Sequence, residues 1–513
     1  MPRLKVPLTL LIVLIALFSC PGFSQAAALY VDNSISSNSC ATYNISSRSC
    51  GGGTATAYKD LNTASGAASP GDTVLVRSGT FTSQFTPQKS GTAGNSITFK
   101  AYSGETPTIT GSGLFPAILL RNRNYLVIDG FKVDNVLGWM GIFDSSDNII
   151  QNCTFNKALD SGTRAGVRFT RARYNKFLNN TVTDGNDSVF LEDSDHNVIA
   201  GNRMTEARHT LLVFACSHYN VARANYFSNT EEKALENFDC EGTIESDYDD
   251  TIQGYKMDAT HHNVFEKNTF AYTRATPDNW RYNAMQFCGQ EAIIRNNDYY
   301  TNLGGGINFQ VYETECDNNY GHRAYNNTFY SNKCYAIFSQ DASDISLKNN
   351  LLYKNTDCSG GSTQAEIGSN VLSVNNKIVT TDPLFVNAAG YDFHLTSGSP
   401  MIDAGAFLST TASAGSGTSL KVADSKYFYS GYGIPGEIGD TIQLAGQTQL
   451  AKITDIDYTN NILTLDTSLT WNGGQGVGLA YSGSAPDVGS YEYSGTTPPE
   501  TTPPAPPIGV RVR

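Results

Sequence analysis

Charged side chains stand at matching positions in the short apolar stretches that precede a repeated Asn-containing turn. If Phe169, Leu191, Phe214 and Met257 all point into a core, their neighbours along each strand must point outward. One outward column then contains Arg168, Phe190, Val213 and Lys256, and the next contains Thr170, Glu192, Ala215 and Asp258. This pattern predicts cations and carboxylates gathered on one face of a sheet.

Such a face has chemistry suited to an acidic ligand. Arg168 can bind a carboxylate through two parallel N–H groups. The alternative is a salt bridge at the rim, and Lys256 can equally be a surface lysine paired with Asp258 or Glu192. His209, in "EARHTLL", is a further candidate on this face unless it only ends a strand. Both readings stay open.

Long insertions accompany this face. Gln286, Asn308 and Gln310 continue it, and the segments 231–252 and 274–282 lie beside it in the repeat. Loops of this size on one edge of a repeat protein often form the walls of a binding groove. Trp280, Tyr282 and Tyr312 offer flat apolar faces for sugar rings, although they can equally pack the loops themselves.

One insertion is rich in carboxylates. The stretch "ESDYDD" contains Glu245, Asp247, Asp249 and Asp250. Hard cations such as Ca²⁺ prefer oxygen clusters of this kind, so Ca²⁺ is the one cofactor that the sequence suggests. The spacing is not that of a known calcium loop, and an acidic loop can simply face water. No Cys–His spacing indicates zinc.

The repeat itself predicts the scaffold. Seven asparagines fall into register when the repeats are aligned: Asn180, Asn202, Asn225, Asn268, Asn297, Asn327 and Asn350. The steps from Asn180 to Asn202 and from Asn202 to Asn225 are 22 and 23 residues, and some later steps are lengthened. A period in this range, built from short β-type runs, indicates a solenoid whose stacked coils bury a shared core. Asparagines at one turn of every coil can then form a hydrogen-bonded ladder.

The chain resembles the right-handed parallel β-helix proteins, a group rich in secreted polysaccharide lyases. The resemblance rests on the repeats, on "AYKDLNTASGAASPGDTVLVRSGTF" near the start, and on "DPLFVNAAGYDFHLTSGSPMIDAG" and "APDVGSYEY" near the end. It implies an all-β fold with a helix-bearing N-terminal cap. We expect the β-helix over residues 29–405, a small inserted β-domain over 406–484, a closing segment over 485–493 and a Pro/Thr-rich tail over 494–513.

The resemblance also implies a reaction. Lyases of acidic polysaccharides neutralise the uronate carboxylate, remove the C5 proton and expel the C4 oxygen, and relatives on this fold use Lys, Arg or His as the base. Lys256 would then be the base, since neighbouring Arg168 or Arg281 would favour its neutral form. Arg168 or Arg281 would hold the carboxylate, and Asp258 would orient Lys256 or help to hold a cation.

Two other functions remain open. Glu192 and Asp258, two coils apart in one column, would lie roughly 10 Å apart, at the upper edge for inverting glycoside hydrolysis. "DGNDSVFLED" is similar to the paired-aspartate segment of polygalacturonases, but the Asn-Thr-Asp triplet and His-Gly pair of that family are absent. The third possibility is a non-catalytic protein that only binds extracellular glycan.

The N-terminus and the composition indicate where the protein works. Residues 1–28 read as a signal peptide, with lipidation at Cys20 as the rival, so we expect a secreted, periplasmic or cell-surface monomer without a transmembrane segment in the mature chain. The net charge of −13 argues against nucleic-acid binding. Export permits disulfides, and we expect one between Cys40 and Cys50 and a free core thiol at Cys216.

Overall fold

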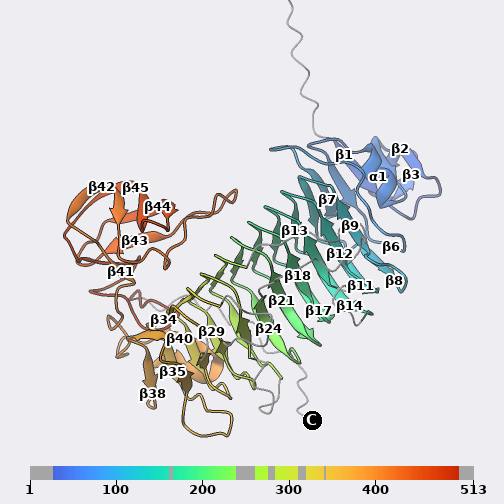
Figure 1. Cartoon of the computed structure of the whole chain (residues 1–513). Coiled ribbons are helices and arrows are strands. Elements are labelled where there is room, and N and C mark those ends of the chain that lie inside the picture. The colour runs from blue at the N-terminus through green and yellow to red at the C-terminus, as the bar shows by residue number, and fades with distance from the viewer. Residues whose placement is uncertain are drawn as a thin grey trace, which may run out of the picture.

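Three strands and three turns form each coil of the chain. The computed structural model describes residues 27–160, 166–238, 260–274, 283–309, 319–339 and 342–495. In them the chain winds into a right-handed parallel β-helix, nearly all β, as the sequence predicted (Figure 1). A representative coil runs through β13 (Ile149–Gln151), β14 (Thr154–Ala158) and β15 (Val167–Thr170) before β16 (Lys176–Leu178) begins the next one.

Stacking of the coils produces three long sheets, named here A, B and C, whose strand orders follow within the described residues. Sheet A runs β3 (Ser49–Cys50), β2 (Ser39–Asn44), β4 (Ala55–Tyr58), β1 (Ala28–Val31), β5 (Thr73–Val76), β7 (Ile97–Ala101), β10 (Leu126–Asp129), β13, β16, β19 (Val198–Ala200), β22 (Val221–Arg223), β25 (Val264–Glu266), β28 (Ile293–Arg295), β31 (Arg323–Tyr325), β34 (Ile345–Lys348) and β37 (Val371–Val374). Sheet B runs β38 (Lys377–Val379), β35 (Leu351–Tyr353), β32 (Thr328–Tyr330), β29 (Asp298–Tyr300), β26 (Thr269–Ala271), β23 (Tyr226–Ser228), β20 (Arg203–Ala207), β17 (Thr181–Gly185), β14, β11 (Lys132–Val136), β8 (Thr108–Gly111) and β6 (Thr80–Phe81). Sheet C runs β36 (Ala365–Ile367), β33 (Ile337–Ser339), β30 (Ile307–Asn308), β27 (Met285–Phe287), β24 (Lys233–Phe238), β21 (Thr210–Ala215), β18 (Val189–Glu192), β15, β12 (Met140–Phe143) and β9 (Ile118–Arg121).

Inward side chains of all three sheets fill one continuous core. Equivalent positions on successive coils lie directly above one another, so like residues stack. The rings of Phe227, Phe270, Tyr299 and Phe329 follow one another with centroid separations of 4.9, 4.7 and 4.6 Å. One coil could not bury these rings alone, which is why the fold requires many repeats.

The predicted asparagine ladder is confirmed at the turn between sheets A and B. Each backbone N–H in the series donates to the side-chain oxygen of the asparagine on the next coil, from Asn180 to Asn202 (2.8 Å) and onward through Asn225 (3.0 Å). The same bond continues through Asn268, Asn297, Asn327 and Asn350 to Asn376. These buried amides hydrogen-bond to one another, so the ladder lets the turn bury polar groups that still have partners.

A second ladder lies at the turn between sheets C and A. It links Asn148, Asn175, Asn197, Asn220 and Asn263. Two coils further on, His322 takes the same role: its Nδ1 accepts from the Ala292 N–H at 3.1 Å, and its Nε2–H donates to Asn319 Oδ1 at 2.7 Å. The ring is therefore held as one neutral tautomer.

The N-terminal end carries the expected helical cap. Helix α1 (Leu61–Ala67) starts at Asp60, whose side chain accepts from the Thr63 N–H, and Leu61 and Ala64 pack into the core. The predicted Cys40–Cys50 disulfide is present in this region, and a second joins Cys334 to Cys358. The expectation for Cys216 was wrong, because it is disulfide-bonded; among the described residues the free, buried thiol is Cys153.

An antiparallel sheet lies near the C-terminus, also as predicted. Its strand order is β41 (Ser409–Thr410), β46 (Gly476–Leu479), β43 (Thr441–Leu444), β44 (Leu450–Asp457), β45 (Ile462–Trp471) and β42 (Gly415–Lys421). The chain enters and leaves this inserted sheet side by side, since the Gly405 N–H donates to Pro486 O and the Asp403 N–H to Asp487 Oδ1. The hairpin β39 (Phe385–Asn387) and β40 (Asp392–Leu395), with a 3₁₀ turn over Ala388–Gly390, precedes it.

The inserted sheet docks on the outer face of sheet A. There Val221, Val264 and Ile293 point away from the solenoid core and pack against inserted residues such as Leu420 and Phe428. Arg295, fully buried, connects Glu266 of the solenoid to Asp440 of the inserted sheet at 2.7 and 2.6 Å. The sequence did not indicate which face the insertion would cover.

Among the described residues no helix has the length and apolarity needed to cross a bilayer. Residues 1–26 of the expected signal peptide, Cys20 among them, and residues 496–513 of the expected tail lie outside those residues.

Candidate functional site

The outer face of sheet C brings the predicted polar residues together. Strand pairing places Arg168 beside Phe190, and Glu192 between Thr170 and Ala215. Further along the same face, Gln286 pairs with Asn308. The column of outward residues expected from the repeat therefore exists for these members.

The register expected for Lys256 and Asp258 is wrong. Val213 pairs with Glu236, which in turn pairs with Gln286, and Ala215 pairs with Phe238. The residues of "QGYKMD" alternate from Tyr255 to Asp258 and those of "KALENF" do not. Even so, "KALENF" supplies the strand, with Leu235 fully buried between Leu212 and Met285. The insertion follows strand β24 instead of preceding it.

Many predicted site residues lie outside the described part of the chain: Lys256, Asp258, Arg281, Trp280, Gln310, Tyr312, Glu245, Asp247, Asp249 and Asp250. The proposed Ca²⁺ ligands are all among them. Across the described residues no group of three or more His, Cys, Asp or Glu side chains could hold a metal ion.

Two cation–carboxylate pairs lie on this face. Arg168 Nη2 is 3.2 Å from Glu192 Oε2, and its guanidinium lies 3.8 Å from the centre of the Phe190 ring. Lys233 Nζ donates to Glu236 Oε1 at 2.6 Å. All four charged side chains are nearly buried although they point away from the core. Buried charges are stable only when paired, so these pairs are held in place.

A third pair lies where the strands of sheet C begin. His209 Nδ1–H donates to Oδ1 of Asp187 at 2.6 Å, and its Nε2 is 3.3 Å from Glu232 Oε2. Burial lowers the pKa of His209, but the hydrogen bond and charge of Asp187 outweigh it, so the net pKa is raised. Because both ring nitrogens face carboxylates, the imidazolium form is favoured. About a third of the ring remains exposed.

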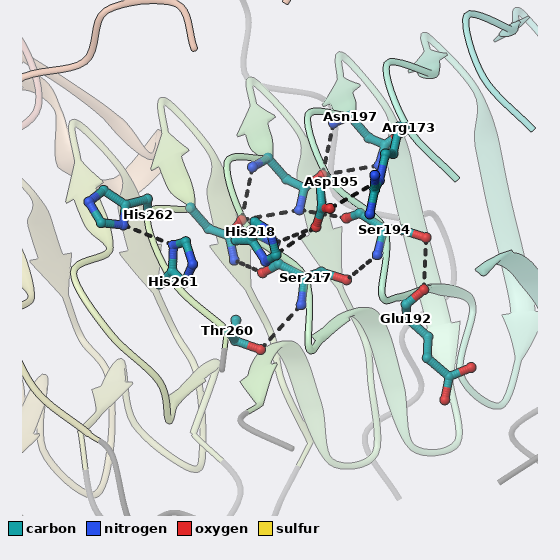
Figure 2. A network of polar contacts seen from close by, with 12 residues as sticks. Arg173, Glu192, Ser194, Asp195, Asn197, Ser217, His218, Thr260, His261 and His262 are labelled. Atoms are coloured by element: carbon teal, nitrogen blue, oxygen red, sulfur yellow. Dashed lines mark hydrogen bonds and ion pairs between the residues drawn. The ribbon is translucent and has the colours of Figure 1, made fainter. Parts of the chain in front are cut away.

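The far edge of the sheet is also polar. Asp193 directly follows β18 in a left-handed backbone conformation, and its buried Oδ2 has no hydrogen-bond partner among the described residues. Burial, with a smaller contribution from Asp195, raises the pKa of Asp193 to about 6. Beyond it, the turn toward sheet A is stabilised along the stack: the Ser194 N–H donates to Ser217 Oγ, and the Ser217 N–H to Thr260 Oγ1 (Figure 2).

The histidines of that turn pack against one another. His218 stacks on His261 at 4.4 Å, and His261 Nδ1 contacts His262 Nδ1 at 2.9 Å (Figure 2). His262 in turn contacts Glu291 at 3.0 Å, and Glu291 contacts Lys426 of the inserted segment at 2.9 Å. This series connects the solenoid to the insertion.

Sequence reasoning missed Asp187, Glu232, Lys233 and Glu236. A signal was present, because Asp187, His209 and Glu232 stand immediately before the apolar runs "SVFLE", "TLLVFA" and "KALENF". Aligning the repeats on these runs, and not only on the asparagine turns, would have placed the three residues at one edge of sheet C.

The long connections also adjoin this sheet. The chain between Phe238 of β24 and Val264 of β25, and the chain between Ala271 of β26 and Met285 of β27, are far longer than the two-residue turn that joins β25 to β26. Both long connections begin or end at a strand of sheet C. Insertions of this kind commonly carry function on a rigid scaffold.

Comparisons with known proteins support the fold. A family model described as the Pel9A-like right-handed β-helix region matches residues 43–203. The crystal structure of the pectate lyase Pel9A is 14% identical with a TM-score of 0.48, and the match covers 91% of this chain and 97% of that one. A lacto-N-biosidase of family GH136 from Eubacterium ramulus is 11% identical with a TM-score of 0.48, over 69% of this chain and 68% of that one.

A mannuronan C-5 epimerase module, AlgE6, from Azotobacter vinelandii is 11% identical with a TM-score of 0.39, over 63% of this chain and 94% of that one. No match was found among the curated proteins.

Proposed function

We propose that this protein binds an acidic extracellular polysaccharide along the outer face of sheet C and cleaves it by β-elimination. The observation that carries the proposal is the set of three cation–carboxylate pairs at that face: Arg168–Glu192, Lys233–Glu236 and His209–Asp187. A uronate carboxylate that takes the place of a protein carboxylate beside such a cation keeps that cation paired. The Pel9A-like match contains Arg168, Glu192 and Asp187, and Pel9A is a pectate lyase.

The reaction needs a base, an acid and neutralisation of the uronate. Lys256 is proposed to remove the C5 proton, with Arg168 or Arg281 neutralising the substrate carboxylate. The C5–H electrons form the C4–C5 double bond while the C4–O bond breaks. The leaving oxygen needs a proton, and His209 is suited to donate it because Asp187 and Glu232 favour its imidazolium form.

The net charge of −13 opposes the approach of a polyanion. Screening at physiological salt limits that repulsion to about 8 Å. At shorter distances the cations of sheet C attract the carboxylates of the substrate. The binding groups can therefore act even though the whole molecule is acidic.

The hydrolase alternative required Glu192 and Asp258 in one column, two coils apart. The place expected for Asp258 in the column of Glu192 is occupied by Phe238. The described part of that column therefore offers no second carboxylate two coils away.

A substrate panel tests the proposal. Pectate, alginate, glycosaminoglycan and glucuronan are each incubated with the full chain, with and without Ca²⁺, and unsaturated uronate is followed by its ultraviolet absorbance. We expect product from at least one uronan, lost in Arg168→Gln. Reducing ends released only from a neutral glycan would favour a hydrolase, and binding without any product would favour a scaffold. Either result would reject the lyase.

A further inference from the structure

A cavity lies away from sheet C, at the junction of three parts of the chain. It has a volume of about 400 Å³ and is lined by solenoid turns at Lys267 and Asn326, by Asp440 and Thr441 of the inserted sheet, and by the closing residue Glu492. Small-molecule sites typically measure about 300–1,000 Å³ and often form where domains meet. The size and location are those of a binding site.

The walls of this cavity are preorganised. Its floor is the buried series Glu266–Arg295–Asp440, joined at 2.7 and 2.6 Å. On the solenoid side, Asn349 Nδ2–H donates to Ala406 O at 2.8 Å. The Asn296 side chain donates to Ser490 O at 3.1 Å and so connects the solenoid to the closing segment. These contacts hold the walls of the cavity in place before a ligand binds.

Two polar groups in the lining are available to a ligand. Among the described residues, no hydrogen bond or ion pair involves the exposed Lys267 ammonium. Glu492 Oε1 accepts from the Asp487 N–H at 2.9 Å, but its buried Oε2 has no partner in the described part of the chain. Burial raises the pKa of Glu492 to about 7, so near neutral pH this carboxyl can donate to a hydroxyl or accept from one.

The charge balance indicates what kind of ligand fits. The lining contains three cations, Arg223, Lys267 and Arg295, and three acidic groups, Glu266, Asp440 and Glu492. A balanced lining with amides between the charges favours a neutral, hydroxyl-rich molecule over an ion. Ile438, two-thirds exposed at this cavity, together with Leu479 and Pro486, offers an apolar surface for the C–H face of a sugar ring.

We infer that the junction cavity binds the end of a neutral saccharide, one or two sugar units long, as a site separate from sheet C. The inserted sheet then has a binding role, since it supplies one wall of the site. This inference does not depend on the lyase reaction, because none of the lining residues lies on sheet C.

Calorimetric titration of the full chain with neutral disaccharides tests the inference. The probes are cellobiose, maltose, lactose, xylobiose and mannobiose, with digalacturonate as the charged comparison. We expect one or more neutral probes to bind at one site, with affinity reduced about tenfold in Lys267→Ala through loss of a charged hydrogen bond. Ile438→Asp, which removes the exposed apolar surface at the cavity, should weaken binding at least as much without disturbing the fold.

Lys100→Ala, on a distant coil, and His209→Gln, on sheet C, are the matched controls and should bind like the parent. Three results would overturn the inference: no binding of any neutral disaccharide, parental affinity in both Lys267→Ala and Ile438→Asp, or loss of binding in His209→Gln. A failed lyase assay would leave this test unaffected.

Discussion

His209 and Asp187, which lie on neighbouring coils where the strands of sheet C begin, share a hydrogen bond of 2.6 Å between Nδ1 and Oδ1. Asp187 is buried, while His209 is about a third exposed. One end of the imidazole is therefore held by the protein and the other can face a substrate. This arrangement is suited to proton transfer.

Replacing His209 by glutamine should lower the rate of uronan cleavage about a hundredfold, which is typical for loss of a general acid. The acid form is needed, so the parent rate should fall as pH rises through the raised pKa of His209, and this descending limb should disappear in the variant. Initial rates between pH 5 and 10 provide the measurement. His394→Gln is the matched control, because His394 makes a similar 2.7 Å contact with Asp392 far from sheet C. Equal losses in both variants would remove His209 from the reaction.

Lys256→Ala should lower turnover by about a hundredfold or more, because the proposed C5 base is removed. Turnover and KM are measured separately on the best uronan of the panel. Lys354→Ala, another lysine in the same chain, should leave both unchanged. Full activity in Lys256→Ala would reject that residue as the base.

The protein should lose stability in mild acid. Burial lowers the pKa of His261 and of His322 to about 3. The unfolded chain takes up these protons below about pH 6.5 and the folded chain only near pH 3, so the free energy of unfolding should fall across that window. Urea denaturation at pH 7, 5.5 and 4.5 measures the slope.

His322→Asn should flatten that slope, because asparagine is the ladder residue at this turn and does not titrate. His394→Asn serves as its control and should keep the parent slope. An unchanged slope in His322→Asn would contradict the role given to its buried neutral ring.

Breaking the asparagine ladder should destabilise the solenoid. Asn225 Nδ2–H donates to Ile199 O and to Asn268 Oδ1, and Asn225 Oδ1 accepts from the Asn202 N–H. Asn225→Ala removes these partners from the buried Ile199 O and Asn202 N–H, at a cost of about 1–3 kcal/mol each. Asn460→Ala, in an exposed turn, should change the free energy of unfolding by less than about 0.5 kcal/mol. Similar small effects at both sites would mean that the ladder is not stabilising.

The junction between the solenoid and the inserted sheet depends on Arg295. Arg295→Met leaves Glu266 and Asp440 buried without their common cation and should cost about 3–5 kcal/mol. Lys132→Met, which removes a partly exposed partner of Asp134, should cost no more than about 1 kcal/mol. Denaturant unfolding of both variants gives the comparison. A loss no larger in Arg295→Met than in Lys132→Met would show that the buried series does not hold the junction.

The scaffold was more predictable than the site for a physical reason. The asparagines from Asn180 to Asn350 repeat because each must pair with the next coil, so their spacing in the sequence records a contact in space. The Cys40–Cys50 disulfide could also be predicted from the sequence, because its two cysteines are only 10 residues apart. The charged face of sheet C has no such periodic constraint.

Strand choice inside a long insertion was therefore ambiguous. The alternation from Tyr255 to Asp258 favoured "QGYKMD", whereas the strand is formed by the non-alternating "KALENF", whose Leu235 is buried between two coils. The docking of the insertion on sheet A was equally hidden. Val221, Val264 and Ile293 resemble ordinary core residues in sequence, although they point away from the solenoid core and into the interface.

The central claim is that a C–O bond next to a uronate is broken by elimination and not by water. The most direct measurement compares the number of unsaturated uronates, from ultraviolet absorbance, with the number of new reducing ends in the same digest. Elimination at the sheet C site predicts one unsaturated uronate for each new reducing end, with both lost together in Arg168→Gln. New reducing ends without unsaturated uronate, or neither product from any acidic polysaccharide, would contradict the claim.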